Sequence, residues 1–244
     1  MTKVSIIIAT YNSSSTIRAA LESVRTQTFR DWECLVVDGA SKDDTIAIVK
    51  EYCEKDERFR YVSEKDNGIY DAFNKGWRMA KGEWVHYLGS DDRLTKDGME
   101  KVAIELDDHF AIVTGDVYLH RVDGTERLQE YHGFFGCHQG VLMKRDAFQM
   151  LNGFNEQYRI LADYELMVRV KKSGNKVKNV RAAIAYFTMG GESQQLQSQW
   201  KKMWERYLIN KRHGVKRHPL ASSMLVFFRH SAIGLYRSLR YKFL

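Results

Sequence analysis

Short apolar runs alternate with amphipathic segments over the first hundred residues of this chain of 244 residues. A run of about four to eight apolar residues between turn residues predicts a buried strand, and apolar residues at helical spacing predict a helix packed on it. Strands that alternate with helices form βαβ units, so the pattern predicts an α/β fold with a mainly parallel sheet. We expect strands over residues 4–10, 32–38, 59–63, 84–88 and 110–114, and helices over about 15–27, 44–52, 69–80 and 95–106.

The alternation stops after residue 114, and the second half of the chain shows a different pattern. Residues 118–131 predict two strands that meet at Asp123-Gly124, a turn sequence typical of hairpins. The sheet should therefore become antiparallel or mixed in this half. We expect helices near residues 145–151 and 163–172, and two short strands over residues 176–180 and 183–187.

Residues 199–244 differ from the rest of the chain in charge. They contain eleven Lys or Arg residues and a single acid, Glu205, whereas the formal charge of the whole chain is +7. The local excess of +10 leaves −3 for residues 1–198. We therefore predict a globular domain over residues 1–198 and a basic, amphipathic, helical extension over residues 199–244.

The extension ends in a predicted helix that begins at Pro219, because proline suits the first turn of a helix. One face of this helix is apolar and the opposite face is basic. Such a helix can lie on an anionic membrane, or it can pack on the protein itself with its cations solvated. The apolar face consists of Leu225, Phe228, Ala232, Leu235 and Leu239, and the basic face of Arg229, His230, Arg237 and Arg240.

Composition narrows the class of protein. With 44% apolar residues, a chain of this length can bury a large core, so a disordered protein is not expected. Cys34, Cys53 and Cys137 are odd in number and widely spaced, as in proteins with reduced thiols. No apolar stretch reaches the roughly 18 residues of a spanning helix, and no basic leader precedes the first strand. We therefore expect a cytoplasmic protein that can also lie peripherally on the inner face of the cytoplasmic membrane.

Polar residues follow four predicted strands. Thr10-Tyr11-Asn12 ends the first strand, Asp38 ends the second, residues 66–74 follow the third, and Asp91-Asp92 follows the fourth. The carboxyl ends of parallel strands face the ligand crevice of an open sheet. There a carboxylate can accept a hydrogen bond from a pyrimidine N–H, and a hard cation can bridge carboxylates to substrate phosphates. Each segment alone could be a turn or a helix cap, but four in succession favour a single ligand site.

Five segments have the residue types and the order of a known set of motifs: residues 4–12, 36–45, 66–76, 88–92 and 162–166. Together they resemble the motifs of glycosyltransferase family 2, over about the first 200 residues. The chain is similar in particular to the bacterial enzymes that build surface polysaccharides such as colanic acid, capsule and O-antigen. This resemblance implies a GT-A fold, which is Rossmann-like, with a mixed, mostly parallel sheet flanked by helices. Residues 1–115 would form the nucleotide-sugar-binding half and residues 116–198 the acceptor-side half.

The resemblance also implies roles for single residues. Asp163 would be the general base, and His138 and Gln139 would lie on the acceptor side. Asp91 would bind Mn²⁺ or Mg²⁺ through the diphosphate of the donor, with Asp92 in a secondary role. The donor, a nucleotide-diphosphate sugar, would be bound by Thr10, Tyr11, Asn12, Asp38, Asp66, Asn67, Asn74 and Asp91.

The chain departs from the family pattern at three positions. The family often has Asp where this chain has Gly39 and Gly89, and often has Glu where it has Ala162. A missing carboxylate at Gly89 leaves fewer charges for the metal, so Asp91 must contribute more of the binding. A glycine-rich segment over residues 190–193 could close over the donor as a lid.

We therefore predict an inverting glycosyltransferase of surface polysaccharide biosynthesis. It would move a sugar from a nucleotide-diphosphate sugar, with UDP favoured, to a hydroxyl of a saccharide or of a lipid-linked saccharide. A phosphohydrolase is a rival, but its nucleophilic Asp would stand at the end of the first strand, where this chain has Thr10-Tyr11-Asn12. A catalytically inactive relative is another, because of Gly89 and Ala162.

The basic extension could also bind nucleic acid through its cations and aromatic residues. However, Trp200, Trp204 and Tyr207 fall at helical spacing with Met203, as core or interface residues do. We therefore expect no nucleic-acid partner, and we expect residues 219–244 to be the segment that contacts an anionic membrane.

Overall fold

One half of the central sheet consists of β1 (Val4–Thr10), β2 (Trp32–Asp38), β3 (Phe59–Ser63) and β4 (Trp84–Gly89). The computed structural model describes residues 2–121, 123–131, 137–189 and 196–227, and these four strands are parallel in the order β3-β2-β1-β4. Thr10 pairs with Asp38, and Asp38 pairs with Ser63 on the next strand. The carboxyl ends of the strands therefore share one edge of the sheet, as the apolar runs predicted.

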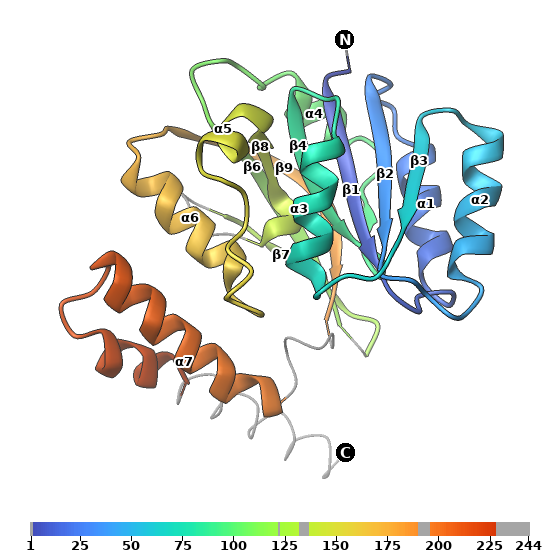
Figure 1. Cartoon of the computed structure of the whole chain (residues 1–244). Helices are drawn as coiled ribbons and strands as arrows, with labels where there is room; N and C mark the ends of the chain where they lie inside the picture. The colour runs from blue at the N-terminus through green and yellow to red at the C-terminus, as the bar shows by residue number, and fades with distance from the viewer. Residues whose placement is uncertain (1, 122, 132–136, 190–195, 228–244) are drawn as a thin grey trace.

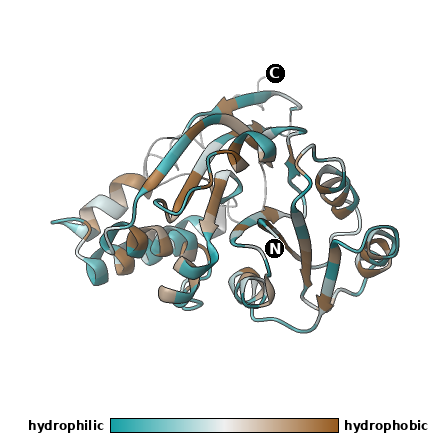
Figure 2. Cartoon of the chain, turned by 90° about the horizontal axis from the view of Figure 1, so that it is seen from above, coloured by the Kyte–Doolittle hydropathy of each residue, from teal (hydrophilic) through white to brown (hydrophobic). Residues whose placement is uncertain are grey.

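Helices cover both faces of this sheet (Figure 1). On one face, α1 (Ile17–Arg25), α2 (Thr45–Lys55) and α4 (Gly98–Ala103) bury a core with Ile6 and Ile8. On the other face, α3 (Ile69–Met79), α5 (Arg145–Met150) and α6 (Ala162–Lys172) bury a second core with Ile7 and Leu35. Successive residues of a strand point to opposite faces, so β1 contributes to both cores. Figure 2 shows hydrophobic residues gathered on the strands, while the helices carry both colours.

The other half of the sheet is mixed. It consists of β5 (Arg93–Leu94), β6 (Ile112–His120), β7 (Glu126–Gln129), β8 (Val141–Lys144) and β9 (Val177–Thr188). β8 joins the two halves, because it pairs antiparallel with both β4 and β6. The predicted hairpin is confirmed as the antiparallel pair of β6 and β7. A 3₁₀ turn, η1 (His138–Gly140), leads into β8.

Two predictions for this half were wrong in detail. The two short strands expected over residues 176–180 and 183–187 are one strand, β9, and β6 likewise joins two predicted strands. The two strands pair in parallel with register shifts around Asp116. A Cβ at Gly115 would lie 2.6 Å from the carbonyl oxygen of Ala182. The glycine that interrupts the apolar pattern therefore marks a close approach of two strands, where the chain continues through a bulge.

The helix predicted over residues 95–106 is shorter, because the backbone of Thr95 bonds to other elements. The backbone N–H of Thr95 donates a hydrogen bond of 2.8 Å to the carbonyl of Ile184 on β9. The Thr95 carbonyl in turn accepts a bond of 2.7 Å from the side chain of Gln27. Both backbone groups are used outside a helix, so α4 begins only at Gly98.

The C-terminal part of the chain begins with α7 (Leu196–His213), which lies beside α6 (Figure 1). Residues 219–227 are also helical, so the predicted helix at Pro219 is confirmed as far as it is described. The rest of its predicted faces, from Phe228 to Arg240, and the lid expected over residues 190–193 lie outside the described residues. Over the residues that can be described, no helix is both long and apolar enough to cross a membrane.

Candidate active site

The end of β2 holds a buried carboxylate, that of Asp38. It accepts hydrogen bonds from the backbone N–H of Ser41 at 2.9 Å, from the hydroxyl of Ser63 at 2.7 Å, and from the hydroxyl of Ser41. A carboxylate offers about four acceptor positions. Three donors therefore occupy three of these positions, and one acceptor position of the buried Asp38 carboxylate remains.

The turn after β1 is tied to the segment after β2. Asn12 has a φ of 47°, in the left-handed region that Asn tolerates. Its side-chain carbonyl accepts a bond of 2.8 Å from the N–H of Lys42, and its own N–H donates to the Ser41 hydroxyl at 2.8 Å. Tyr11 is 58% exposed, so its ring is free to stack on a flat group. The structure thus brings Thr10, Tyr11 and Asn12 to the same edge as Asp38.

Asp66 approaches this edge from the segment after β3. Its carboxylate accepts a bond of 2.9 Å from the N–H of Gly68. A Cβ at Gly39 would lie 2.6 Å from Oδ2 of Asp66. A second carboxylate at position 39, as the family often has, would require the side chain of Asp66 to move. Asn67 is exposed, and its backbone carbonyl accepts a bond from the guanidinium of Arg159.

Asn74 is buried, and all of its hydrogen-bonding groups are used within the protein. Its side-chain NH₂ donates to the carbonyl of Phe154 at 2.9 Å and to Glu156 at 2.7 Å. Its side-chain carbonyl accepts from the N–H of Phe154 at 2.9 Å and from the indole of Trp77 at 3.1 Å. Asn74 therefore fixes α3 to the segment before α6, and a ligand could bond to it only by displacing these groups.

The two members of the acidic pair after β4 lie in different environments. Asp91 is exposed, whereas Asp92 is 1% exposed. Asp92 accepts bonds from the side chain of Gln139 at 2.6 Å and from the N–H of Thr188 at 2.8 Å. Burial and the neighbouring charge of Asp91 raise the pKa of Asp92 to about 6, against the lowering effect of these donors. Asp92 thus joins the end of β4 to η1 and β9.

Gly89 makes room for this arrangement. A Cβ at position 89 would lie 2.4 Å from Oδ2 of Asp92 and 2.9 Å from Oδ1 of Asp91. An Asp at this position would therefore require the carboxylate of Asp92 to shift away from its two hydrogen-bond donors.

A divalent cation fits this donor set only in part. Asp91 presents a hard oxygen ligand at the surface, while both oxygens of Asp92 already accept protein hydrogen bonds. In the described part of the chain, no group of three or more His, Cys, Asp or Glu residues could hold a metal. Mg²⁺ commonly binds through one or two carboxylates together with substrate phosphates. Asp91 fits that mode as a single protein ligand.

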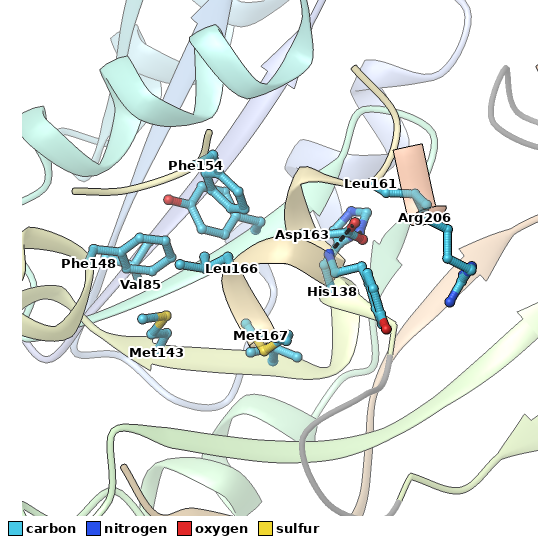
Figure 3. Close-up of a pocket in the computed structure, with 13 residues that line it drawn as sticks. Val85, His138, Met143, Phe148, Phe154, Leu161, Asp163, Leu166, Met167 and Arg206 are labelled. Carbon is cyan, nitrogen blue, oxygen red and sulfur yellow. Dashed lines mark hydrogen bonds and ion pairs between the residues drawn. The ribbon is translucent and has the colours of Figure 1, made fainter. Parts of the chain in front are cut away.

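Asp163 lies near the start of α6, and about one third of its side chain is exposed. Burial raises the pKa of its carboxyl. The hydrogen bond and charge of His138, the N–H of Tyr164 and the hydroxyl of Tyr70 outweigh that effect, so the net pKa lies below the ordinary value. Nδ1 of His138 is 3.8 Å from Oδ2 of Asp163, and Figure 3 shows the two side chains facing each other. Asp163 is therefore ionised at neutral pH and can accept a proton.

η1 connects the two carboxylate sites. His138 faces Asp163, and the next residue, Gln139, is 2% exposed and bonds to Asp92. The acidic pair on β4 and the acid on α6 are thus held by consecutive residues of one short turn. The sequence pointed to His138 and Gln139, but it did not show that they join these two acids.

Two other residues help to position Asp163, and the sequence did not predict either role. The hydroxyl of Tyr70 lies 2.8 Å from the carbonyl of Ile160 and 3.2 Å from Oδ1 of Asp163, two acceptors that share its proton. Glu205 of α7 bonds to the backbone just before α6. Tyr70 stands inside a segment singled out as a motif, and Glu205 is the lone acid of a basic extension. Both signals were present in the sequence without a partner to explain them.

A cavity of about 220 Å³ opens beside Asp163 (Figure 3). Its inner end is apolar, with Val85, Met143 and Phe148, and Asp163 and His138 stand at its polar end. Ligand sites in proteins are commonly concave and apolar with a few placed polar groups. This shape, next to an ionised carboxylate, is that of a site where a hydroxyl could be held and deprotonated.

Comparison with known proteins agrees with this geometry. The model of the family described as Glycosyl transferase family 2 matches residues 5–228. The chain belongs to glycosyl transferase family 2. As a family 2 member it is a glycosyltransferase that acts on nucleotide sugars, and the predicted family is confirmed.

Two relatives of this family 2 enzyme differ in the share of their own length that the alignment covers. It is 34% identical over 176 residues to a PGL/p-HBAD biosynthesis glycosyltransferase of Mycobacterium bovis, an alignment that covers 68% of each chain. It is 28% identical over 183 residues to the chondroitin synthase of Escherichia coli, which covers 70% of this chain and 27% of the synthase.

Solved structures confirm the GT-A fold of this family 2 enzyme. S. aureus TarS 1-349 in complex with UDP-GlcNAc gives a TM-score of 0.71 at 21% identity, over 91% of this chain and 69% of TarS. The mannosyltransferase PcManGT from Pyrobaculum calidifontis, in complex with GDP-Man and Mn²⁺, gives 0.71 at 16% identity, over 98% of this chain and 75% of PcManGT.

Proposed function

We propose that this family 2 enzyme is an inverting glycosyltransferase of surface polysaccharide biosynthesis. It transfers a sugar from a UDP-sugar to a hydroxyl of a saccharide or of a lipid-linked saccharide. The observation that carries this proposal is the ionised, partly exposed carboxylate of Asp163 at the polar end of a cavity. A hydroxyl is a weak nucleophile, so a carboxylate within hydrogen-bonding reach must take its proton as the attack proceeds.

The residues around the cavity support inversion. A single displacement inverts the anomeric carbon and needs one base, whereas a double displacement also needs a second group as nucleophile. Among the described residues that line the cavity, Asp163 is the only carboxylate. His138 and Tyr70 hold that carboxylate in its ionised form. This set of groups suits a general base better than a nucleophile with a partner acid.

The edge of the sheet supports a nucleotide donor with a pyrimidine base. Asp38 has acceptor capacity left for the N–H of uracil, and the exposed ring of Tyr11 could stack on the base. TarS is described with UDP-GlcNAc and PcManGT with GDP-Man. We favour UDP, with Asp38 toward the base and Asp66 and Asn67 toward the ribose and diphosphate. Asn74 then acts as a positioning residue that fixes α3.

Asp91 is the residue proposed to hold Mn²⁺ or Mg²⁺ against the donor diphosphate, since it is the exposed acid of the pair. A cation bound there would act as a Lewis acid for the leaving diphosphate. Asp92 was predicted as the secondary metal ligand. Because both of its oxygens accept protein hydrogen bonds, we propose for it a positioning role toward Gln139 and the end of β9 instead.

The test is a panel of UDP-, GDP- and dTDP-sugars, each measured once with Mn²⁺ and once with a chelator. The measurements are the thermal shift of the enzyme and the release of the nucleotide. A ligand that binds only the folded state raises its melting temperature. We expect UDP-sugars to give the largest shift and metal-dependent release of UDP. A response confined to GDP-sugars would overturn the choice of UDP. The absence of a response to any sugar nucleotide would overturn the proposed sugar transfer.

We also propose a cytoplasmic enzyme at the inner face of the membrane, where a lipid-linked acceptor would lie. The basic residues of 199–244 support this location, since anionic lipids attract clustered Lys and Arg.

A further inference from the structure

One face of α7 exposes tryptophan side chains. Trp200 is 62% exposed, Trp204 54% and Leu208 37%. Residues four apart lie on the same side of a helix, so the three side chains form a stripe. The sequence pattern suggested that both tryptophans belong to a core or an interface, and their exposure removes the core from these choices.

The opposite face of α7 is buried against the catalytic domain. Glu205, Ile209 and Asn210 are at most 9% exposed. Glu205 bonds to the segment before α6, and Asn210 accepts a bond of 3.1 Å from the hydroxyl of Tyr164. α7 therefore has one side fixed to the protein, and its tryptophan stripe lies on the other.

The helical residues 219–227 extend the exposed apolar surface. The ring of Phe227 lies 4.3 Å from that of Trp200, measured between centroids, which brings the two helices together. On this second helix Leu220 is 48% exposed, Met224 40% and Leu225 72%. Exposed apolar side chains on two helices that are in contact are candidates for an interaction site on a soluble protein.

Exposed basic side chains lie on α7 and between the two helices. Lys201, Lys211 and Arg212 on α7 are exposed, and so are Lys216 and Arg217 between the two helices. Tryptophan favours the headgroup level of a bilayer, leucine the acyl boundary below it, and Lys and Arg the anionic headgroups. A nucleic acid would use the cations and the aromatic rings but would leave the exposed leucines in water.

We propose that this α7 surface docks the enzyme on an anionic lipid bilayer. Its members are Trp200, Trp204, Leu208, Leu220 and Leu225, with the five exposed cations around them. The proposal deepens the membrane location given above and moves its centre from residues 219–244 to α7. It does not depend on sugar transfer, because docking needs neither donor nor acceptor. Bound in this way, α7 would hold the catalytic domain next to lipid-linked substrates.

The test is flotation of the full chain with vesicles of phosphatidylcholine and phosphatidylglycerol, against vesicles of phosphatidylcholine alone. The double variant Trp200→Ser/Trp204→Ser should bind anionic vesicles at least about tenfold more weakly, because it removes two exposed rings from the docking surface. Its matched control is Ile104→Ser/Met150→Ser, which removes two apolar side chains that are 80% and 73% exposed elsewhere. The control should partition as the natural chain does.

A fluorescence measurement reads the same contact directly. The chain has five tryptophans, and Trp32, Trp77 and Trp84 are at most 9% exposed. A blue shift on adding anionic vesicles, with quenching by brominated lipid, therefore reports on Trp200 and Trp204. The signal should vanish in the double variant, whose melting temperature serves as the check on folding.

Three results would overturn the proposal. These are no flotation of the full chain, equal loss in the control pair, and vesicle binding that is unchanged in a folded tryptophan variant. Tighter binding to a single-stranded oligonucleotide than to anionic vesicles, weakened by the tryptophan changes, would instead assign the surface to nucleic acid. The transferase proposal stands or falls separately, on the sugar-nucleotide panel.

Discussion

Glu205 of α7 accepts a hydrogen bond of 2.8 Å from the backbone N–H of Leu161, two residues before Asp163. The same carboxylate accepts bonds from the N–H groups of Arg159 at 2.8 Å and Ile160 at 3.0 Å. One buried acid on α7 thus binds three consecutive amides of the segment that leads into α6. The predicted extension over residues 199–244 therefore supplies a positioning residue for the candidate base.

Glu205→Gln should lower kcat about 10- to 100-fold and leave the KM for the donor nearly unchanged. A glutamine has one acceptor oxygen, so it cannot bond to all three amides, and each lost bond to a charged group costs about 1.5–3 kcal/mol. The measurement is steady-state kinetics together with the thermal shift given by the donor. Glu54→Gln, at an exposed acid of α2, is the matched control and should change neither value. Loss of stability with unchanged kcat would show that Glu205 serves only the fold.

Asp163→Asn should retain donor binding and lose about 10²- to 10⁴-fold in turnover, the usual contribution of a general base. Asparagine keeps the size of the side chain and an acceptor for the Tyr164 N–H, but it cannot take a proton. The thermal shift with a sugar nucleotide measures binding, and release of the nucleotide in the presence of acceptor measures turnover. Turnover near that of the natural chain would remove Asp163 as the base.

Tyr70→Phe should move the acidic limb of the pH–rate profile to higher pH. The Tyr70 hydroxyl is one of the donors that hold the pKa of Asp163 below its ordinary value, so its removal raises that pKa. The base is active only when ionised, and a raised pKa means that activity is lost at a higher pH as the solution becomes more acidic. The profile of kcat from about pH 3 to about pH 7 measures this, since the limb of the natural chain lies below the ordinary carboxyl pKa of about 4, and an unchanged limb would contradict it.

The sequence predicted the features that depend on neighbouring residues and missed those that depend on contacts between distant residues. The bounds of β1, β2 and β3 were predicted to the residue, because each is a mainly apolar segment that ends at a polar residue. The bonds of Asp92 to Gln139 and Thr188 span 47 and 96 residues. No local pattern encodes such contacts, so Asp92 was predicted as a secondary metal ligand and its role as a link was missed. The role of Glu205 was missed for the same reason. It bonds to backbone N–H groups, which every residue except proline has, so the sequence gives no sign of its partners.

Asp91→Ala should weaken metal-dependent donor binding about tenfold or more. A chelator should weaken donor binding by the natural chain and leave donor binding by the variant unchanged. The reason is that Asp91 is the exposed acid of the pair and the one proposed to hold the cation. Calorimetry with a UDP-sugar, with and without Mn²⁺, measures this difference. Gly89→Asp is the companion variant and should lower stability without adding metal affinity, because its Cβ meets Asp92 at 2.4 Å. Equal metal dependence in Asp91→Ala would exclude Asp91 as the ligand.

His86 on β4 should make the enzyme less stable as the pH falls from 6.5 toward 4. The side chain is buried, Nδ1 lies 3.1 Å from the carbonyl of Val141, and Nε2 has no hydrogen-bond partner among the described residues. Burial lowers the pKa of His86 from 6.5 to about 4, against the raising effect of the Val141 carbonyl. In this pH range the unfolded chain therefore binds a proton at His86 that the folded chain does not.

The free energy of unfolding should then fall by up to about 1.4 kcal/mol per pH unit at this one site. Between pH 7 and pH 5 the natural chain should lose roughly 2 kcal/mol more than His86→Leu, as measured by urea unfolding. Subtracting the two variants cancels the titration of other groups, including Asp92, whose raised pKa acts in the opposite direction. Val113→Ala, at a buried residue of β6 without a titratable group, is the control and should keep the natural pH dependence. The same slope in His86→Leu would mean that His86 is protonated in the folded protein.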